Sequence, residues 1–220
     1  MCGRFYLDVA RDKLKAHYRL KRVPKLVARF NISPSQDIAA IRESKEGREL
    51  AILHWGLIPS WAKDVKSHYS MINARAETVA SKPAYRAAFR HRRCLIPVSG
   101  FYEWHPQDHD KQPYAIQMKD GEPFSLAGLW EHWQGENGKS IESCAVIVTD
   151  ANALLTPIHD RMPVIIATDD YETWLNPEMQ DIDVLNALLY PYPAEYLQAF
   201  PVSRDVNNPA HDEPSCIKPI

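Results

Sequence analysis

The chain has 220 residues, 45% of them hydrophobic, and a formal net charge of −2 at pH 7. That length allows a substantial core, and we expect one domain over residues 1–220. No apolar run reaches the roughly 18 residues that a membrane helix needs, and the hydrophobic stretch of a signal peptide is missing from the start of the sequence. We therefore expect a cytoplasmic protein without a membrane partner.

The small net charge hides a division of the chain into a basic and an acidic part. Residues 1–93 hold 20 Lys and Arg against 8 Asp and Glu, whereas residues 94–220 hold 6 against 20. Such asymmetry favours a polyanionic partner, although a solvated helix face is the alternative for any one basic run. The run that stands out contains Lys63, Lys66, Arg75, Lys82, Arg86, Arg90, Arg92 and Arg93, against only Asp64 and Glu77.

Three elements are predicted in the basic part. A helix is expected after Asp8, which would serve as its N-cap, and should extend to about residues 19–22. Residues 50–58 are typical of a strand that ends at Pro59. Residues 83–91 predict a short basic helix that begins at Pro83.

From residue 94 onward the pattern is typical of strands. Residues 94–104 predict one strand, and Asp120-Gly121 and Asn137-Gly138 are typical hairpin turns. The runs that flank these turns are 114–118, 124–130, 131–133 and 143–148, which together predict an antiparallel meander. Two late helices are expected, at 169–176 after Asp169 or Asp170 and around 181–190. The predicted fold is a single α+β domain with a curved, barrel-like antiparallel β core and peripheral helices.

Cysteine spacing argues against metal and disulfide sites. The four cysteines are Cys2, Cys94, Cys144 and Cys216, without a C-x-x-C pair or a histidine at ligand spacing. Neither a zinc site nor a disulfide framework is predicted, and a reduced protein fits best. We expect no metal and no cofactor.

The cysteine directly behind Met1 has a distinctive chemistry. Removal of Met1 would leave Cys2 with a free α-amine beside its thiol. An α-amine has a pKa near ~7.7–8.0, so part of it is neutral and nucleophilic at pH 7. A 1,2-aminothiol attacks an aldehyde first with nitrogen, to give an imine, and then with sulfur, which closes a five-membered ring intramolecularly. The alternative is an ordinary thiol in a frayed terminus.

Three segments place polar residues where apolar ones are expected. Asn73 lies in a stretch, 72–78, that alternates polar and small residues; a surface loop is the alternative. Glu103 stands among aromatic residues in a strand, where burial would raise its pKa toward the range of a general acid and base; a solvent-facing Glu is the alternative. His159 lies in a Pro-bracketed loop beside Asp160 and Arg161, and a structural histidine is the alternative.

Tryptophan near the basic run suggests contact with nucleic acid. Aromatic rings interleaved with cations suit single-stranded nucleic acid, because bases stack on the rings while the backbone meets charge. Trp55 is expected in the core. Trp61, followed by Lys63, is the better stacking candidate.

Taken together, these segments resemble the SRAP domain family (SOS response-associated peptidase), the abasic-site processing proteins. The matching blocks are MCGRF (1–5), FNISP (30–34), WGLIP (55–59), NARAET (73–78), GFYEW (100–104), HDRMP (159–163) and PVSR (201–204). They follow the family's order over nearly the whole chain, and residues 35–50 and 168–198 carry no matching motif.

The resemblance implies an active site of Cys2, Asn73, Glu103 and His159. In this family the freed Cys2 captures the aldehyde of an abasic site in single-stranded DNA and leaves a covalent thiazolidine crosslink. Glu103 would act as acid and base, His159 would protonate the sugar oxygen or the carbinolamine hydroxyl, and Asn73 would hold the Cys2 amine or thiol. Slow β-elimination is a possible side reaction of the imine.

A wider set of residues is expected to contact DNA, with the arginines binding phosphate. The set is Gly3, Arg4, Asn31, Pro34, Trp61, Arg75, Arg86 and Arg161. We expect a monomer that joins the nucleoid when it is bound to DNA.

Two other functions stay open from the sequence. One is a cysteine peptidase with Cys2 as nucleophile and His159 as base, whose activity confined to removal of Met1 would be compatible with the first function. The other is a non-catalytic binder of single-stranded or modified DNA. Peptide hydrolysis does not require an amino-terminal cysteine, whereas an imine does.

Overall fold

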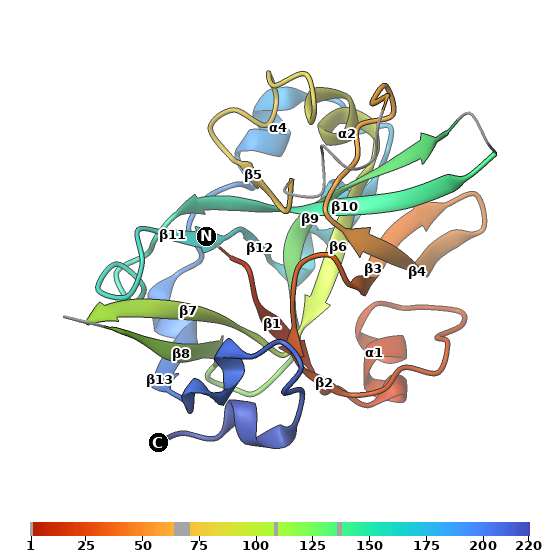
Figure 1. The fold of residues 1–220 in the computed structure, drawn as a ribbon. Helices are drawn as coiled ribbons and strands as arrows, with labels where there is room; N and C mark the ends of the chain where they lie inside the picture. The colour runs from red at the N-terminus through yellow and green to blue at the C-terminus, as the bar shows by residue number, and fades with distance from the viewer. Residues whose placement is uncertain (1, 64–70, 108–109, 136–137) are drawn as a thin grey trace.

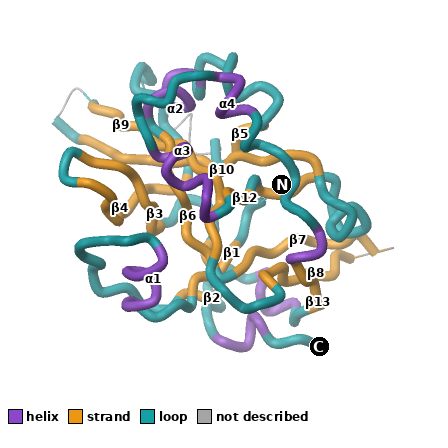
Figure 2. Tube along the Cα trace, turned by 180° about the vertical axis from the view of Figure 1, so that it is seen from behind, coloured by secondary structure: helices purple, strands orange, loops and turns teal. Residues whose placement is uncertain are grey.

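The computed structural model describes residues 2–63, 71–107, 110–135 and 138–220. Within them the chain forms two sheets, with short helices around them (Figures 1 and 2). The predicted α+β class with a curved, barrel-like β core and peripheral helices is confirmed. Met1, Asp64 and Lys66, and Asn137 of the predicted second turn, lie outside the described residues.

The smaller sheet carries the amino-terminal strand. Its five strands follow the order β13-β8-β7-β1-β2 and all pair antiparallel. They are β1 (Phe5–Leu7), β2 (Arg29–Ile32), β7 (Gly100–Gln107), β8 (Asp110–Met118) and β13 (Leu197–Pro201). β1 is fully buried between β7 and β2, so the chain is anchored almost from its start.

The larger sheet has eight strands and mixed pairing. Its order is β11-β10-β4-β3-β6-β9-β12, with β5 joined to β10. The strands are β3 (Asp37–Ser44), β4 (Gly47–Trp55), β5 (Asn73–Arg75), β6 (Arg93–Val98), β9 (Phe124–Gln134), β10 (Ser140–Asp150), β11 (Arg161–Pro163) and β12 (Ile165–Ile166). β10 pairs parallel with β4 and β5 and antiparallel with β9 and β11, so the core is mostly, but not wholly, antiparallel.

The predicted single strand over 94–104 is wrong, and so is the predicted hairpin at Asp120-Gly121, because β8 and β9 belong to different sheets. The other antiparallel pairs of the predicted meander, β7 with β8 and β9 with β10, are confirmed. The run divides at Ser99: β6 belongs to the larger sheet, and β7 to the smaller one. Gly100 opens β7 where a Cβ would meet the Tyr6 ring at about 2.5 Å, so the chain needs a glycine at this crossing. The chain then forms β7 and β8 before it returns to the larger sheet as β9. β9 also unites the two runs predicted as separate strands.

The helices are short, and two of them pack against β6 and β9, interior strands of the larger sheet. They are α1 (Arg11–His17), α2 (Arg86–His91), α3 (Tyr171–Leu175) and α4 (Ile182–Asn186), with 3₁₀ turns at Thr168–Asp170, Ala194–Tyr196, Arg204–Asn207 and Pro214–Ile217. The predicted cap at Asp8 is wrong, because α1 begins after Ala10 without a side-chain cap. The predicted start at Pro83 is three residues early, because Lys82 to Tyr85 form a turn first. Asp181 caps α4 through the amides of Asp183 and Val184.

The two sheets meet around an aromatic pair. The rings of Phe5 on β1 and Trp55 on β4 lie 5.1 Å apart and are buried. Trp55 is therefore a core residue, as the sequence predicts. Because Phe5 stands three residues after Cys2, this contact also fixes the amino-terminal segment between the sheets.

Candidate active site at the amino terminus

The strand pairing of β1 places Cys2 beside Glu103. β1 runs antiparallel to β7, with Phe5 opposite Phe101, and the Tyr102 amide donates to the Arg4 carbonyl. The same register continued toward the amino terminus sets Gly3 opposite Glu103 and brings Cys2 next to it. Cys2 and Glu103 are both buried, at 0% and 2% exposed.

Asn73 reaches Cys2 from the larger sheet. It opens β5, whose parallel pairing with β10 fixes its backbone, and Tyr85 donates its hydroxyl to the Asn73 carbonyl at 3.0 Å. The Asn73 Nδ2 donates to the Cys2 carbonyl oxygen at 2.9 Å, so this contact is to the backbone and not to the predicted amine or thiol. Asn73 Oδ1 is buried and accepts no hydrogen bond from the described residues.

His159 approaches Glu103 from the loop before β11. β10 lies between β5 and β11, which brings the His159 loop and Asn73 to the same part of the larger sheet. Figure 1 shows the amino terminus between these strands and β7. The Nε2 of His159 lies 4.0 Å from Glu103 Oε2. Sequence-distant parts of both sheets therefore meet at one point.

The other ring nitrogen of His159 has two neighbours. Its Nδ1 accepts the Arg161 amide at 2.9 Å, which requires a lone pair there and places the proton of the neutral ring on Nε2, toward Glu103. The Asp160 carboxylate lies 2.8 Å from Nδ1 and is an acceptor for the protonated ring. The loop thus provides a partner for either charge state of His159.

Burial shifts the ionisation of all three titratable groups. It raises the pKa of Glu103 to about 7, and Asp160 adds to the rise. It raises the pKa of the Cys2 thiol well above its ordinary range, and the Glu103 carboxylate raises it further. It lowers the pKa of His159. Near neutral pH the site therefore offers a carboxyl that is present in both forms, a neutral thiol and a neutral imidazole.

Two cavities adjoin the site. The first, about 470 Å³, is lined by Asn73 together with Trp61, Met71, Arg75, Thr78, Lys82, Pro83, Ala84 and Tyr85. The second, about 390 Å³, is lined by Glu103 and His159 together with Trp104, Lys111 and Asn207. Each cavity combines at least one cation with one tryptophan.

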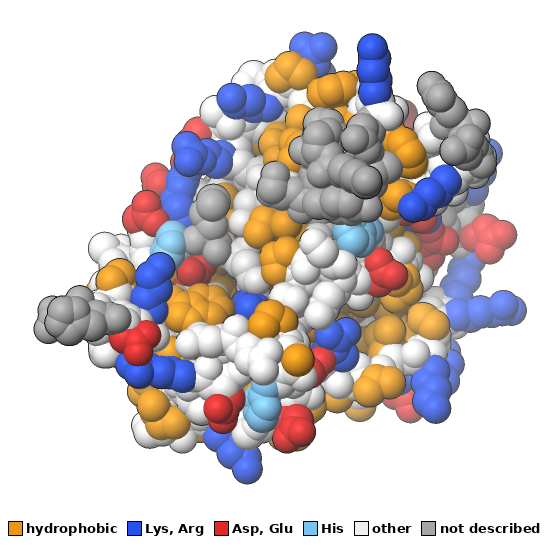
Figure 3. All heavy atoms as spheres, viewed as in Figure 1, with side chains coloured by type: hydrophobic (Ala, Val, Ile, Leu, Met, Phe, Trp, Pro, Cys, Tyr) orange, Lys and Arg blue, Asp and Glu red, His pale blue; other side chains and the backbone are white. Residues whose placement is uncertain are grey.

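Some of the residues predicted to contact DNA are on the surface. Trp61 is 62% exposed, and Arg75 and Arg86 are exposed as well. Gly3 and Pro34 are half-buried. Figure 3 shows Lys and Arg side chains gathered in the part of the molecule where Figure 1 places α2 and β5.

Other predicted DNA contacts are engaged inside the protein. The Arg4 guanidinium donates to Asn31 Oδ1 and to the Val206 carbonyl, both at 2.6 Å. Asn31 is fully buried, and its amide donates to the carbonyls of Val206, Asn208 and His211. Arg161 contacts the carboxylates of Glu77 and Asp150. These side chains hold the carboxyl-terminal segment and the His159 loop in place.

The basic run of residues 63–93 is also less exposed than its composition suggests. Arg93 is 3% exposed and donates to the carbonyls at the ends of α2 and α3, namely those of Phe89, Arg90, Trp174, Asn176 and Met179. Arg92 pairs with Glu131 at 2.8 Å. Arg92 and Arg93, the last two cations of this run, therefore stabilise the fold.

Sequence reasoning missed the residues that support the site from a distance. Tyr85 positions Asn73, and Trp133 donates its indole N–H to the Ala62 carbonyl at 2.7 Å, next to Trp61. Their partners lie 12 and 71 residues away in sequence. Because no local motif marks such contacts, only the assembled fold shows them.

No grouping suited to a metal ion occurs in the part of the chain that the structure describes. Nor does that part contain a helix that is long and apolar enough to cross a membrane. The four cysteines are buried and free.

Comparisons with known proteins found a matching family model, named relatives and similar solved structures. A family model described as SOS response associated peptidase (SRAP) matches residues 1–209. The abasic site processing protein YoqW of Bacillus subtilis is 41% identical over 99% of both chains. The abasic site processing protein HMCES of Xenopus tropicalis is 35% identical over 79% of this chain and 58% of its own length. A crystal structure of a protein from Bacteroides thetaiotaomicron superposes with a TM-score of 0.89, at 27% identity and 100% coverage of both chains.

Proposed function

Since the chain belongs to the SOS response associated peptidase (SRAP) family, we propose that it processes abasic sites in single-stranded DNA by forming a covalent crosslink through Cys2. The observation that carries this proposal is that Asn73 and Glu103 both adjoin the buried Cys2, while His159 lies 4.0 Å from Glu103. Relatives over the full length of the chain are named abasic site processing proteins, which supports the substrate class.

The first bond forms between the α-amine nitrogen of Cys2 and C1′ of the abasic sugar. Removal of Met1 exposes the Cys2 α-amine, and the buried Asn73 Oδ1 is available to accept a hydrogen bond from it. A protonated Glu103 or His159 Nε2–H donates a proton to the ring oxygen, the C1′ hydroxyl gives up its own proton and so restores the acid, and the closed sugar opens to its aldehyde. The neutral amine adds to C1′ to give a carbinolamine. The carbinolamine loses its hydroxyl as water with a proton from the same acid, and its N–H proton returns to that group, which leaves the imine.

The second bond forms between the Cys2 sulfur and C1′. Because burial keeps the Cys2 thiol protonated, a base must remove its proton, and the adjacent Glu103 carboxylate is suited to this step. Sulfur attacks the imine carbon while the imine nitrogen takes a proton, which closes the thiazolidine. The sum is aldehyde plus aminothiol giving thiazolidine and one water. The raised pKa of Glu103 lets one group serve as acid first and as base second.

The raised pKa of the Cys2 thiol argues against a general cysteine peptidase. Such enzymes depend on a thiolate, which a lowered pKa favours. A single event, the removal of Met1, stays compatible with the site. A β-elimination of the imine is a further side reaction, because the imine makes C2′ more acidic.

We assign binding of the DNA strand to the exposed members of the predicted set. Trp61 offers a ring for base stacking, and Arg75 and Arg86 offer charge for phosphates. The cavity beside Asn73 holds two of them, Trp61 and Arg75. Arg4, Asn31 and Arg161 are assigned a positioning role because their polar atoms are engaged internally.

The test is a crosslinking assay. Single-stranded DNA that contains one abasic site is incubated with the protein and resolved on a denaturing gel. We expect a shifted band for the wild type and none for Cys2→Ala, with Cys144→Ala as the matched cysteine control that retains the band. A band of equal strength in Cys2→Ala, or no band for the wild type, would contradict the proposal.

A further inference from the structure

A second basic surface, away from Cys2, covers α1 and the loop that follows it. Residues 11–29 contain eight Lys and Arg against one Asp, a denser balance than in residues 63–93. Three of these cations have a carboxylate partner: Lys13 with Glu122, Arg19 with Glu172 and Arg29 with Asp212. α1 and the amino terminus lie on opposite sides of β1 in Figures 1 and 2.

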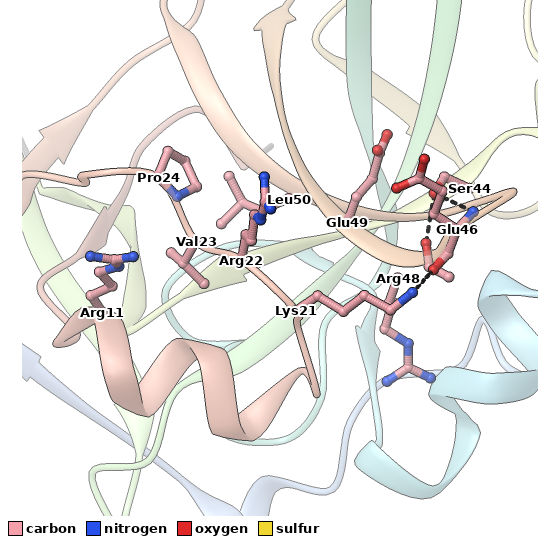
Figure 4. A pocket seen from close by; sticks show the side chains of 11 residues that line it. Arg11, Lys21, Arg22, Val23, Pro24, Ser44, Glu46, Arg48, Glu49 and Leu50 are labelled. Atoms are coloured by element: carbon pink, nitrogen blue, oxygen red, sulfur yellow. Dashed lines mark hydrogen bonds between the residues drawn. The ribbon is translucent and has the colours of Figure 1, made fainter.

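This surface contains a cavity of about 670 Å³. One wall carries Arg11 and residues 21–24, and the other is the β3–β4 hairpin with Glu46, Glu49 and Leu50 (Figure 4). Val23 is buried and Leu50 half-buried. The cavity therefore combines apolar lining with charged side chains.

Three of the six charged side chains that line the cavity are already engaged. Lys21 donates to the Glu46 carbonyl, Arg48 pairs with Glu172 at 2.5 Å, and Glu49 pairs with Arg42 at 2.7 Å. Arg11 and Arg22 differ, because both are exposed and neither has an ion-pair partner among the described residues. The guanidinium groups of Arg11 and Arg22 are thus available to bind an anion of another molecule.

We propose that this cavity, with Arg11 and Arg22 as its ligands, binds phosphate groups of the DNA backbone outside the abasic nucleotide. The proposal rests on the proposed function, which supplies a phosphodiester chain as the partner. Guanidinium groups bind phosphate oxygens in a bidentate fashion and suit this role better than lysine does. Since β1 separates the cavity from Cys2, only DNA that continues well beyond the reacting site reaches both.

Salt dependence tests the proposal directly. The Kd of a long single strand of about thirty nucleotides without an abasic site is measured by fluorescence anisotropy over a range of salt concentrations, for wild type and Arg11→Gln/Arg22→Gln. Two lost phosphate contacts should lower the slope of log K against log salt by about 1.4 and weaken binding roughly 5- to 30-fold near 0.1 M salt. Arg11→Lys/Arg22→Lys should retain most of the slope, because it keeps both charges.

The controls separate this proposal from the proposed function. Lys139→Gln/Lys218→Gln removes the same charge from exposed positions elsewhere and should leave the slope near the wild-type value. Crosslinking to a pentanucleotide with a central abasic site should proceed at the wild-type rate in Arg11→Gln/Arg22→Gln. If this crosslinking persists while the long strand binds with wild-type slope and affinity, the cavity proposal is overturned alone. If the wild type forms no crosslink at all, the proposed function fails instead.

Discussion

The Cys2 site and the basic surfaces around it handle charge in opposite ways. At the site, Cys2 and Glu103 are buried, Asn73 donates to the Cys2 carbonyl, and His159 lies 4.0 Å from Glu103. On the surfaces, cations such as Arg22 and Arg86 are exposed. Burial changes pKa values and favours bond formation, whereas exposure favours reversible binding of a polyanion. Rate at saturating DNA should therefore depend on the site, and affinity and its salt dependence on the surfaces.

The largest effect on crosslinking is expected when the Cys2 thiol is removed and the α-amine is kept. Cys2→Ser retains the α-amine, so an imine still forms, but its hydroxyl is a much weaker nucleophile for ring closure. We expect the stable crosslink to disappear while borohydride still traps the imine on a denaturing gel. A stable band in Cys2→Ser without borohydride would show that the thiol is not needed.

The next effect concerns proton transfer. Glu103→Gln keeps the shape but cannot exchange a proton, so the crosslinking rate at saturating DNA should fall roughly 10²- to 10⁴-fold. In the wild type the acid form declines as pH rises through about 7, and the base form declines as pH falls through it. The wild-type rate should therefore change slope near pH 7, and the variant should lose this inflection. A variant whose Kd rises while its rate is unchanged would move Glu103 to a binding role.

Glu103→Gln should slow crosslinking but increase the stability of the protein relative to wild type as pH rises. The pKa of Glu103 rises from 4.5 to about 7 on folding, so the native state holds this proton more tightly than the unfolded chain does. The contribution of Glu103 to the free energy of unfolding is complete below about pH 4.5 and is lost as pH rises through 7. At about 1.4 kcal/mol per pKa unit, Glu103→Gln should gain about 3 kcal/mol relative to wild type between pH 4 and 8. Denaturant unfolding at the two pH values measures this, and a constant difference would contradict the burial argument.

The sequence alone predicts the residues of the candidate site but not all of the contacts between them. The motifs predict Cys2, Asn73, Glu103 and His159 as residues of the active site, and the structure places these four residues in one region of the molecule. The sequence did not show that Asn73 binds the Cys2 carbonyl, because that contact depends on how β5 and β1 are placed in two different sheets.

Charge was harder to interpret from composition. Arg93 and Arg4 lie in segments that look basic and accessible, yet both donate to carbonyls from distant parts of the chain. The run 94–104 is continuously strand-like, but the close approach of Tyr6 to Gly100 accompanies its division between two sheets. In each case a long-range contact outweighs the local pattern.

A smaller effect is expected at the exposed arginines near the site. Arg75→Gln/Arg86→Gln should weaken binding of abasic single-stranded DNA roughly 5- to 30-fold near 0.1 M salt and reduce the salt slope by about 1.4. The rate at saturating DNA should stay within about twofold of wild type. Anisotropy and single-turnover crosslinking measure the two quantities, with Lys139→Gln/Lys218→Gln as the control. A slower crosslinking rate with unchanged DNA affinity would contradict the assignment of rate to the Cys2 site and of affinity to the basic surfaces.

The smallest effect is expected at Trp133, which supports the segment that bears Trp61. Trp133→Phe keeps most of the ring contacts with Ile58 and Ala62 but removes the donor to the Ala62 carbonyl. The free energy of unfolding should fall by about 1 kcal/mol, and DNA affinity should fall less than about threefold, without a change in rate. Denaturant unfolding and anisotropy provide the readouts. A rate loss beyond tenfold would place this residue in the chemistry.

The central claim is that the amino terminus itself becomes bonded to DNA. Mass spectrometry of the crosslinked protein, after nuclease and protease digestion, tests it most directly. We predict that the modified peptide begins at Cys2, without Met1, and carries the sugar remnant with the loss of one water, and that its thiol resists alkylation. A remnant on a lysine, or on a peptide that retains Met1, would contradict the account.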